Sequence, residues 1–259
     1  MTNAIKEFEA EVARNIAGLK DDTDVQALSR IWLREIARHK YAYNFTWLGR
    51  PLIQFPQDMS AIQELVWRSR PDLIIETGIA HGGSLIMSAS LLTLLDYSDA
   101  VATGTVLDPQ APRRRVLGID IDIRAHNRAA IEMHPMAQRI DMIEGSSISS
   151  EIVAEVHKRA CEYERIMVIL DSSHTHEHVL AELNAYAPLV NSGSYCVVFD
   201  TVIEDLPAGM HSDRPWDVGN NPKTAVHEFL SRNNDFEIDR DIESKLLITV
   251  APGGYLRRL

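Results

Sequence analysis

Two aspartates, Asp171 and Asp200, each follow a short apolar run of the kind that forms a buried strand, at residues 166–170 and 195–199. If these strands are parallel neighbours, both carboxylates lie at the same edge of one sheet and face one another. Unpaired carboxylates repel each other at close range, and a divalent cation between them relieves that repulsion. Oxygen ligands favour magnesium or a similar hard ion, so the pair predicts an Mg²⁺ site.

Three histidines alternate in the segment after Asp171: His174, His176 and His178. They form an alternative metal site, for zinc. Histidines on alternate residues of one short loop rarely converge on a tetrahedral ion, which disfavours this alternative. We expect His176 and His178 to be capping or partly exposed residues, and His174 to lie nearest the strand end.

A glycine-rich segment, Glu-Thr-Gly-Ile-Ala-His-Gly-Gly-Ser, spans residues 76–84 after an apolar strand. Glycines let the chain turn tightly and let a ligand approach the N-terminus of the following helix. The spacing differs from the dinucleotide fingerprint G-x-G-x-x-G and instead suits the amino-acid part of S-adenosylmethionine, whose ammonium group Glu76 could receive directly or through water. A turn with only a structural role is the alternative. The predicted cofactor contacts in this segment are Glu76, Gly78, His81, Gly82, Gly83 and Ser84.

The neighbouring strand ends supply the rest of the predicted cofactor site. Asp120 ends the run at residues 116–119, where an acid can accept hydrogen bonds from both ribose hydroxyls. Ser146 and Ser147 follow the run at residues 140–143 and could border an adenine ring. They could equally cap the helix predicted at residues 150–160, and the two roles are compatible. Asp171 is assigned to the cofactor site as well as to the metal.

From residue 59 onward, short apolar strands alternate with helices, which indicates an α/β fold with a doubly wound, mainly parallel sheet. The seven predicted strands are residues 73–75, 116–119, 140–143, 166–170, 195–199, 236–238 and 245–250. The helices predicted between them are residues 59–69, 85–95, 124–133, 150–160 and 178–186. The last two strands are close in sequence and predict an antiparallel hairpin. In such sheets ligands bind at the carboxyl ends of the strands.

Residues 1–40 show helical spacing of apolar residues in two stretches, and an aromatic, irregular segment follows at residues 41–51. We therefore divide the chain into an N-terminal helical and aromatic arm, residues 1–58, and a cofactor-binding domain, residues 59–259. Residues 96–115 are predicted to be a long loop whose Arg113-Arg-Arg115 run is solvated. Residues 204–223 are predicted to be a lid or acceptor-binding loop, in which Trp216 either stacks on a sugar or anchors the loop.

The composition of the 259 residues is that of an ordered globular protein, with 45% hydrophobic and 24% charged residues. The net charge of -11 disfavours a nucleic-acid partner. The two cysteines, Cys161 and Cys196, exclude a disulfide scaffold and fit a reducing compartment. The longest apolar stretch, residues 84–95, is too short to span a bilayer, and residues 1–17 lack an apolar leader. We therefore expect a cytoplasmic protein with no membrane span.

Six segments carry a resemblance to a known family. They are residues 43–50, 76–84, 118–122, 170–174, 199–201 and 214–223. On these segments the chain resembles the cephalosporin hydroxylase-like family, which includes rhamnosyl O-methyltransferases. The resemblance implies a class I, Rossmann-like methyltransferase fold, S-adenosylmethionine, a divalent cation and a homo-oligomer. It also implies O-methyl transfer to a hydroxyl of a sugar or natural-product glycoside.

Within this resemblance, His174 stands where catechol-type methyltransferases carry a lysine base, and a neutral imidazole is a workable base at neutral pH. The alternative is a structural histidine. A family member presents Glu-Asp at the end of the fifth strand, where this chain has Phe199-Asp200. The third metal ligand is therefore open: we predict Glu204, with Thr201 and water as alternatives.

Two further functions are weighed against methyl transfer. His211, Asp213 and His227 mimic the two-histidine, one-carboxylate set of an iron-dependent oxygenase. However, their segment contains no run of short alternating strands, as a jelly roll requires. A non-catalytic protein that binds S-adenosylmethionine is the other alternative, and the intact Asp171, His174 and Asp200 argue against it.

Overall fold

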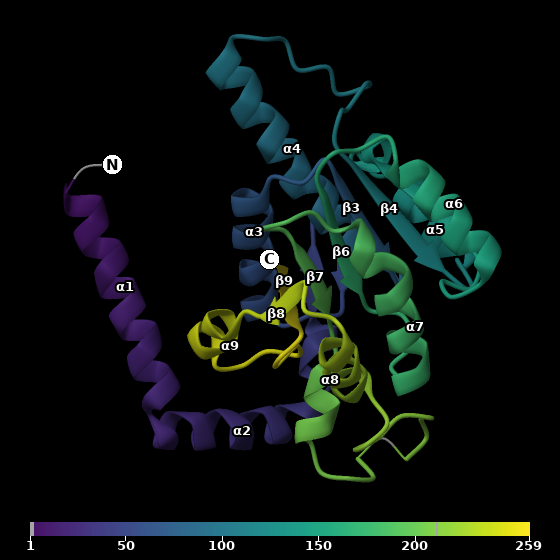
Figure 1. Cartoon of the computed structure of the whole chain (residues 1–259). Coiled ribbons are helices and arrows are strands. Elements are labelled where there is room, and N and C mark those ends of the chain that lie inside the picture. The colour runs from purple at the N-terminus through teal and green to yellow at the C-terminus, as the bar shows by residue number, and fades with distance from the viewer. Residues whose placement is uncertain (1–2, 211) are drawn as a thin grey trace.

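Strands and helices alternate along the chain and build an α/β structure in three layers (Figure 1). The computed structural model describes residues 3–210 and 212–259. Its main sheet has seven strands in the order β5-β4-β3-β6-β7-β9-β8. The strands from β5 to β7 are parallel, and β9 runs antiparallel to both β7 and β8.

The strands of this sheet are β3 (Leu73–Thr77), β4 (Arg115–Asp120), β5 (Ile140–Glu144), β6 (Ile166–Leu170), β7 (Tyr195–Val198), β8 (Phe236–Ile238) and β9 (Tyr255–Arg258). The α-helices are α1 (Asn3–Asp21), α2 (Thr23–Ala37), α3 (Pro56–Ser69), α4 (Gly83–Thr103), α5 (Ala125–Glu132), α6 (Ser150–Ala160), α7 (His176–Tyr186), α8 (Pro222–Arg232) and α9 (Arg240–Leu246). A separate hairpin joins β1 (Phe45–Trp47) and β2 (Arg50–Leu52). The 3-10 helices are η1 (Tyr41–Asn44), η2 (Ala137–Arg139), η3 (Ala187–Leu189) and η4 (Thr201–Asp205).

Alternate residues of each strand point to opposite faces, so the central strands are buried on both sides. Ile74 of β3 belongs to a hydrophobic core beneath α3 and α4, whereas its neighbour Ile75 belongs to a second core beneath α6, α7 and α8. All five residues of β3 and all five of β6 are buried. The two cores hold the strands in register, and that register positions the side chains at the strand ends.

The predicted doubly wound sheet is confirmed, and six of its seven predicted strands are present. The seventh, predicted at residues 245–250, is wrong. Those residues end α9 and continue as a segment whose Val250 backbone N–H donates to Asp58 of α3 (3.0 Å). A buried carboxylate, rather than a neighbouring strand, therefore satisfies this part of the backbone. The antiparallel partner of β8 is β9, which begins at Tyr255.

One helix is longer than predicted, and two helices, α8 and α9, were not predicted. α4 continues to Thr103 and is capped by left-handed Gly104, so much of the predicted loop at residues 96–115 is helical. α8 was not predicted, although Asn221 and Thr224 form a capping box around Pro222, which is a readable helix start. The division of the chain at residue 58 stays a prediction, and it falls inside α3.

The basic run at residues 113–115 is only partly the solvated loop that was predicted: Arg113 is exposed, whereas Arg114 and Arg115 are held in ion pairs. Arg114 is 6% exposed and forms ion pairs with Asp96 and with Asp99 of α4. Arg139 also pairs with Asp96, at 2.6 Å, and Arg115 pairs with Asp141, at 2.7 Å. These pairs fasten α4 to the start of β4, at the edge of the sheet opposite the glycine-rich segment.

α4 is apolar because it is a core helix. Among the described residues it is the one helix long and apolar enough to cross a membrane, by length and composition alone. Its buried residues, which include Leu85, Leu92 and Leu95, pack in the core shared with α3 and the sheet. The expected absence of a membrane span stays a prediction.

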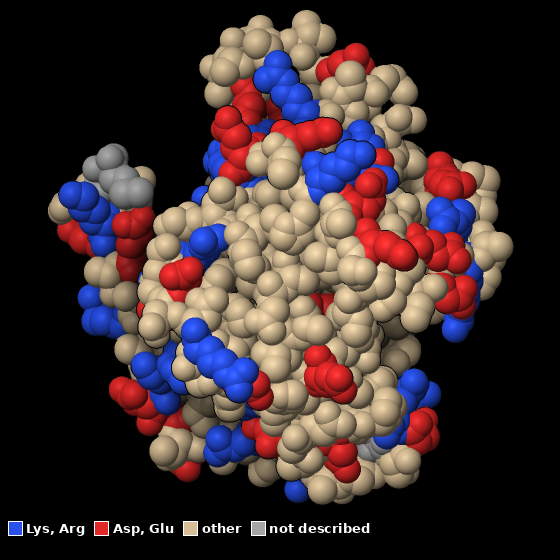
Figure 2. Space-filling view, turned by 45° about the vertical axis from the view of Figure 1, so that its right-hand side comes forward, with Lys and Arg blue, Asp and Glu red and all other residues tan. Residues whose placement is uncertain are grey.

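The arm helices α1 and α2 meet at a sharp bend along one side of the molecule (Figure 1). Asp22 caps α2 by accepting hydrogen bonds from the backbone N–H groups of Asp24 and Val25. No described residue of α1 is buried, and Phe8 is 65% exposed. On the face shown in Figure 2, acidic and basic side chains are interspersed and form no continuous basic stripe.

Candidate functional site

The carboxyl ends of β4, β3, β6 and β7 lie side by side, because the hydrogen-bond ladder continues one residue beyond these strands. Gly78 N–H donates to Ile119 O (2.8 Å) and Asp171 N–H donates to Thr77 O (3.0 Å). Phe199 N–H donates to Leu170 O (3.0 Å). The residues predicted from separate segments of the sequence are thus brought to one edge of the sheet, on both sides of β3.

The glycine-rich segment turns directly over this edge. Gly78 has φ +88°, and a Cβ there would lie 2.1 Å from the carbonyl oxygen of Asp171. Only glycine lets the turn at Gly78 approach the Asp171 backbone so closely. A Cβ at Gly83 would lie 2.1 Å from Pro51 O, so this glycine lets the β1–β2 hairpin pack on the start of α4.

Glu76 lies beneath the glycine-rich segment and is 1% exposed. Burial raises the pKa of its carboxyl to about 7, although hydrogen bonds from Ser88 and Ser84 oppose the shift. Folding therefore favours the protonated form. This group's contribution to stability is complete below pH 4.5 and is lost as the pH rises through about 7. A cation bound nearby would reverse this preference.

Asp120 holds the same segment in place. Its Oδ2 accepts hydrogen bonds from the backbone N–H groups of Ile79 (2.7 Å) and Ala80 (3.2 Å), and its Oδ1 accepts from Asp122 N–H (3.1 Å). An ionised carboxylate has about four acceptor positions, so capacity remains for a ribose hydroxyl. The side chain is half-buried, at the rim predicted for the cofactor.

Two residues that clamp the segment were missed by sequence reasoning. Arg50 of β2 donates through Nε to His81 O (3.0 Å) and through Nη2 to Asn127 Oδ1 (3.2 Å). Asn127 of α5 donates in turn to Ala80 O (2.8 Å) and is 3% exposed. His81 therefore takes part in this clamp through its carbonyl group. The arm hairpin and α5 together fix the loop in which the predicted cofactor contacts lie.

The serines after β5 have different surroundings. Ser147 is 5% exposed, and its hydroxyl donates to Glu182 Oε1 of α7 (2.5 Å) and lies 3.0 Å from His178 Nε2. Ser146 is half-buried, with its hydroxyl outside this network. The cap of α6 is Ser149 rather than either predicted serine. Of the two, Ser146 is therefore the better placed to meet an adenine ring.

Glu182 joins the loops that follow β5 and β6, and sequence reasoning missed it. Its Oε1 also accepts a hydrogen bond from Ser172 (2.7 Å), which follows Asp171 directly. The side chain is fully buried, and its Oε2 has no partner among the described residues. One carboxylate of α7 thus ties together the loops after β5 and β6.

Asp171, His174 and Asp200 form the one group of side chains among the described residues that could hold a metal ion, with one potential ligand atom of each within 4.8 Å of the others. His174 Nε2 lies 3.2 Å from Asp200 Oδ2. Asp200 has a left-handed backbone, φ 56°, which directs the chain into η4 directly after the strand end. Aspartate tolerates this conformation better than most residues, and strained backbone is common at functional sites.

The electrostatics of this group favour a cation. Burial and the nearby Asp200 carboxylate raise the pKa of Asp171 well above its ordinary value. Gln54, which follows β2 and is 3% exposed, donates to Asp171 Oδ2 at 3.4 Å. Its Oε1 is buried without a partner in the described part of the chain. The two carboxylates and the imidazole make a donor set that can hold a divalent ion, with carboxylate oxygens suited to a hard one.

Glu204 does not belong to this group. Its Oε2 accepts hydrogen bonds from Gly219 N–H (2.8 Å) and from the Asn221 side chain, so it fastens the loop that precedes α8. The predicted third ligand is thus occupied elsewhere, and Thr201 Oγ1 donates to Pro252 O (3.0 Å). Trp216 of the same loop packs edge-on against His174, with ring centroids 4.6 Å apart.

The three alternate histidines do not converge on one point, which agrees with the argument against a zinc site. His176 contacts Thr224 (2.8 Å) and Glu228 (3.1 Å) of α8, whereas His178 contacts Ser147, Ser172 and Glu182. The oxygenase alternative gains no support from the described residues: Asp213 is exposed and His227 lies on α8. His211 lies outside the described residues.

The family model described as rhamnosyl O-methyltransferase/CmcI matches residues 39–259. A rhamnosyl O-methyltransferase of Mycobacterium tuberculosis (strain ATCC 25618 / H37Rv) is 29% identical over 234 residues, covering 85% of this chain and 83% of the relative. The corresponding enzyme of Mycobacterium leprae (strain TN) is 28% identical over 230 residues, covering 85% and 88%.

Two solved structures share the fold. A CmcI structure with magnesium and S-adenosylmethionine aligns with a TM-score of 0.53 at 18% identity, covering 84% of this chain and 77% of that chain. The apo structure of CalS11, a TDP-rhamnose 3'-O-methyltransferase of calicheamicin biosynthesis, aligns with a TM-score of 0.52 at 14% identity, covering 100% and 95%. Since the family model spans most of the sequence, from the arm hairpin to the last strand, the chain belongs to the rhamnosyl O-methyltransferase/CmcI family.

Proposed function

We propose that this protein is an S-adenosylmethionine-dependent, divalent-metal-dependent O-methyltransferase that acts on a hydroxyl of a sugar or natural-product glycoside. The main support for this function is the group formed by Asp171, His174 and Asp200, which lies beside the glycine-rich segment. Membership of a family named for rhamnosyl O-methylation supports the reaction and the sugar acceptor. The CmcI structure with magnesium and S-adenosylmethionine supports the two cofactors.

The strand order supports a division of labour along the sheet edge. β3, β4 and β5 carry the residues proposed for the cofactor, and β6 and β7 carry those proposed for the metal and acceptor. β3 and β6 are neighbours, so the two halves meet where the winding of the sheet reverses. Methyl transfer requires the acceptor oxygen in line with the sulfonium methyl group, and rigid strand ends supply that alignment.

Each proposed site residue then has a task. Asp171 and Asp200 would hold the divalent ion, with water in the place first assigned to Glu204. An ion bound there orients the acceptor hydroxyl and lowers its pKa. His174 receives the acceptor proton on its imidazole nitrogen, with its ring held by the edge of Trp216. Asp120 holds the ribose, and Glu76 attracts the cofactor ammonium group through water, since its carboxylate is covered.

The protein is also proposed to form a homo-oligomer, in which the arm helices make contacts between the chains. Apolar side chains remain exposed on α1 and α2, among them Phe8 (65%), Leu28 (64%) and Trp32 (40%). Sedimentation velocity should give a mass above that of one chain, and Phe8→Asp should lower it. A monomer at micromolar concentration would contradict self-association.

A cytoplasmic location stays a prediction, which the free cysteines Cys161 and Cys196 support.

The metal ligands provide the test of the function. With S-adenosylmethionine, Mg²⁺ and a rhamnoside acceptor, the wild-type protein should yield a product heavier by one methylene group in mass spectrometry. Asp171→Asn and Asp200→Asn should each lower the rate by about 10²-fold or more, because the ion that activates the hydroxyl is lost. Calorimetry should show that both variants still bind S-adenosylmethionine.

Glu204→Gln is the matched control and should keep its metal dependence, since Glu204 lies outside the group. Full turnover in excess chelator would show that no divalent ion takes part.

The raised pKa of Glu76 predicts a pH-dependent cofactor affinity. Ionised Glu76 attracts the cofactor ammonium group, and its pKa is about 7 before the cofactor binds. Affinity should therefore rise with pH, by about three- to tenfold between about pH 6 and pH 8. In Glu76→Gln the affinity should be weaker and nearly independent of pH. Calorimetric titrations across this range measure both; an unchanged pH profile in the variant would exclude the role.

The base role of His174 predicts a loss in turnover rather than in affinity. Removal of a positioned base costs about 10²- to 10⁴-fold in rate, so His174→Ala should lower kcat by an amount in that range. The pH dependence of kcat should also change in this variant, because the group that accepts the proton is gone. Rate measurements at saturating Mg²⁺ check this.

His176→Ala is the control and should have a mild effect, since His176 faces α8. A weakened Mg²⁺ affinity in His174→Ala, with kcat restored at high Mg²⁺, would instead identify His174 as a ligand.

A further inference from the structure

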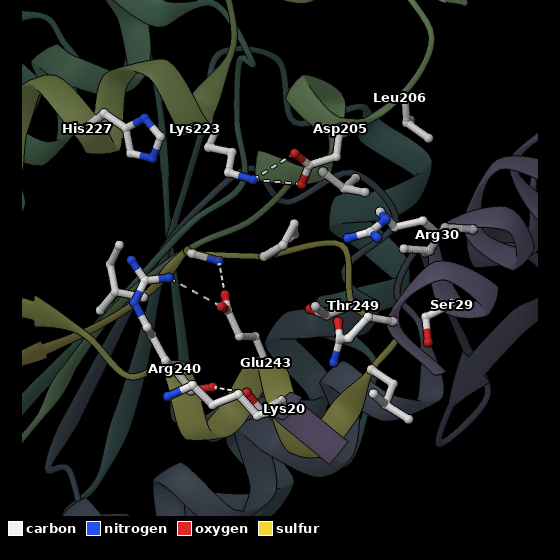
Figure 3. Close-up of a pocket in the computed structure, with 18 residues that line it drawn as sticks. Lys20, Ser29, Arg30, Asp205, Leu206, Lys223, His227, Arg240, Glu243 and Thr249 are labelled. Carbon is white, nitrogen blue, oxygen red and sulfur yellow. Dashed lines mark hydrogen bonds and ion pairs between the residues drawn. The ribbon is translucent and has the colours of Figure 1, made fainter. Parts of the chain in front are cut away.

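A cavity of about 410 Å³ lies between the arm and the C-terminal part of the molecule (Figure 3). Its walls come from the junction of α1 and α2, from η4, from the start of α8 and from α9 with the segment that follows it. The charged side chains that line it are Lys20, Arg30, Asp205, Lys223, Arg240 and Glu243. Its volume is within the range of pockets that hold small molecules.

The 3-10 helix η4 links the metal group to the cavity along the chain. Val202 and Asp205 line it and belong to η4, which begins directly after Asp200. The proposed cofactor residues follow β3, β4 and β5, on the other side of β6 in the sheet. An acceptor whose hydroxyl reaches the metal group would have to pass η4 to enter this cavity.

The acidic groups in the cavity are already paired. Asp205 accepts two hydrogen bonds from Lys223 Nζ, at 2.8 Å and 2.6 Å. Glu243 accepts from Gly253 N–H (2.7 Å) and pairs with Arg240 at 3.5 Å. Dashed lines in Figure 3 mark these contacts. The carboxylates are thus directed at groups of this chain and leave the cavity without free negative charge.

Two cations in the cavity have no partner. Among the described residues, no ion pair or side-chain hydrogen bond involves Lys20 or Arg30, although both line the cavity. Arg30 reaches into it from α2, opposite α9 (Figure 3). Lys20 and Arg30 are exposed, so the surplus positive charge lies on a solvent-accessible wall of the cavity, in a chain whose net charge is -11. A guanidinium and an ammonium group from two different helices suit an anion with several oxygens, such as a phosphate or diphosphate.

We propose that this cavity binds a phosphate or diphosphate group carried by the acceptor, as in an activated sugar; the assignment to an acceptor rests on the proposed function. The neutral sugar then lies toward Asp171 and Asp200, and its anionic end lies between α2 and α9. Arg30 and Lys20 act as specificity residues, because an uncharged glycoside leaves them without a partner. The arm, in this arrangement, completes the acceptor site.

The test is a calorimetric titration with thymidine diphosphate, at saturating S-adenosylmethionine and without Mg²⁺, which keeps the cofactor and metal sites out of the measurement. The wild-type protein should bind it, and the double variant Lys20→Gln, Arg30→Gln should bind about tenfold more weakly or worse. Arg14→Gln, an exposed change on α1 outside the cavity, is the control and should bind as the wild type does. Inorganic pyrophosphate is the second probe: competition with thymidine diphosphate that disappears in the double variant supports recognition of the phosphates themselves.

Wild-type affinity in the double variant, or no binding of either probe by the wild type at millimolar concentration, would overturn the proposal. Both variants change exposed side chains, and their S-adenosylmethionine affinity shows whether they are folded. Methyl transfer is not read in this titration. A failure of the pocket and a failure of the proposed reaction are therefore visible separately.

Discussion

Asp171 and Asp200 repel one another, and the sheet nevertheless holds them together. Each follows a buried strand, and the ladder between β6 and β7 fixes the two strand ends side by side. The cost is visible in the pKa of Asp171, which is raised well above its ordinary value by burial and by the nearby Asp200 carboxylate. A fold driven only by stability would not retain this arrangement; a bound cation turns the repulsion into a binding site. The local strain at left-handed Asp200 has the same explanation.

The cofactor side depends on the same edge of the sheet. Gly78 allows its segment to lie against the Asp171 backbone, so the two halves of the site cannot be moved independently. Asp120, Arg50 and Asn127 hold that segment from three different elements. Methyl transfer benefits from such rigidity, because a small misplacement of the acceptor oxygen relative to the methyl group costs much of the rate.

The part of the structure that could be predicted from the sequence is the part governed by local pattern. The apolar runs located the parallel strands, and the position directly after each run located Asp120, Asp171 and Asp200. The start of α8 was also readable, from Asn221 and Pro222, and was overlooked. The wrong last strand shows the limit of such patterns: residues 245–250 are apolar because they pack beneath the sheet, while Asp58, far away in sequence, satisfies their backbone.

The residues that sequence reasoning missed share one property: their partners lie far away in the chain. Gln54 reaches Asp171 across 117 residues, and Arg50 reaches Asn127 across 77. No local spacing predicts such contacts. Glu204 failed for a related reason, since an acid close to the strand end in sequence is held by the loop before α8. His174, by contrast, was predicted to lie nearest the strand end, and it contacts Asp200 from the short loop that follows Asp171.

Anomalous diffraction from crystals grown with Mn²⁺ and S-adenosylmethionine tests the central claim most directly, because Mn²⁺ replaces Mg²⁺ and can be located by its scattering. The account predicts one strong peak at the end of β6 and β7, within about 2.0–2.3 Å of carboxylate oxygens of both Asp171 and Asp200. No peak there at saturating Mn²⁺, or a peak that contacts neither carboxylate, would contradict it.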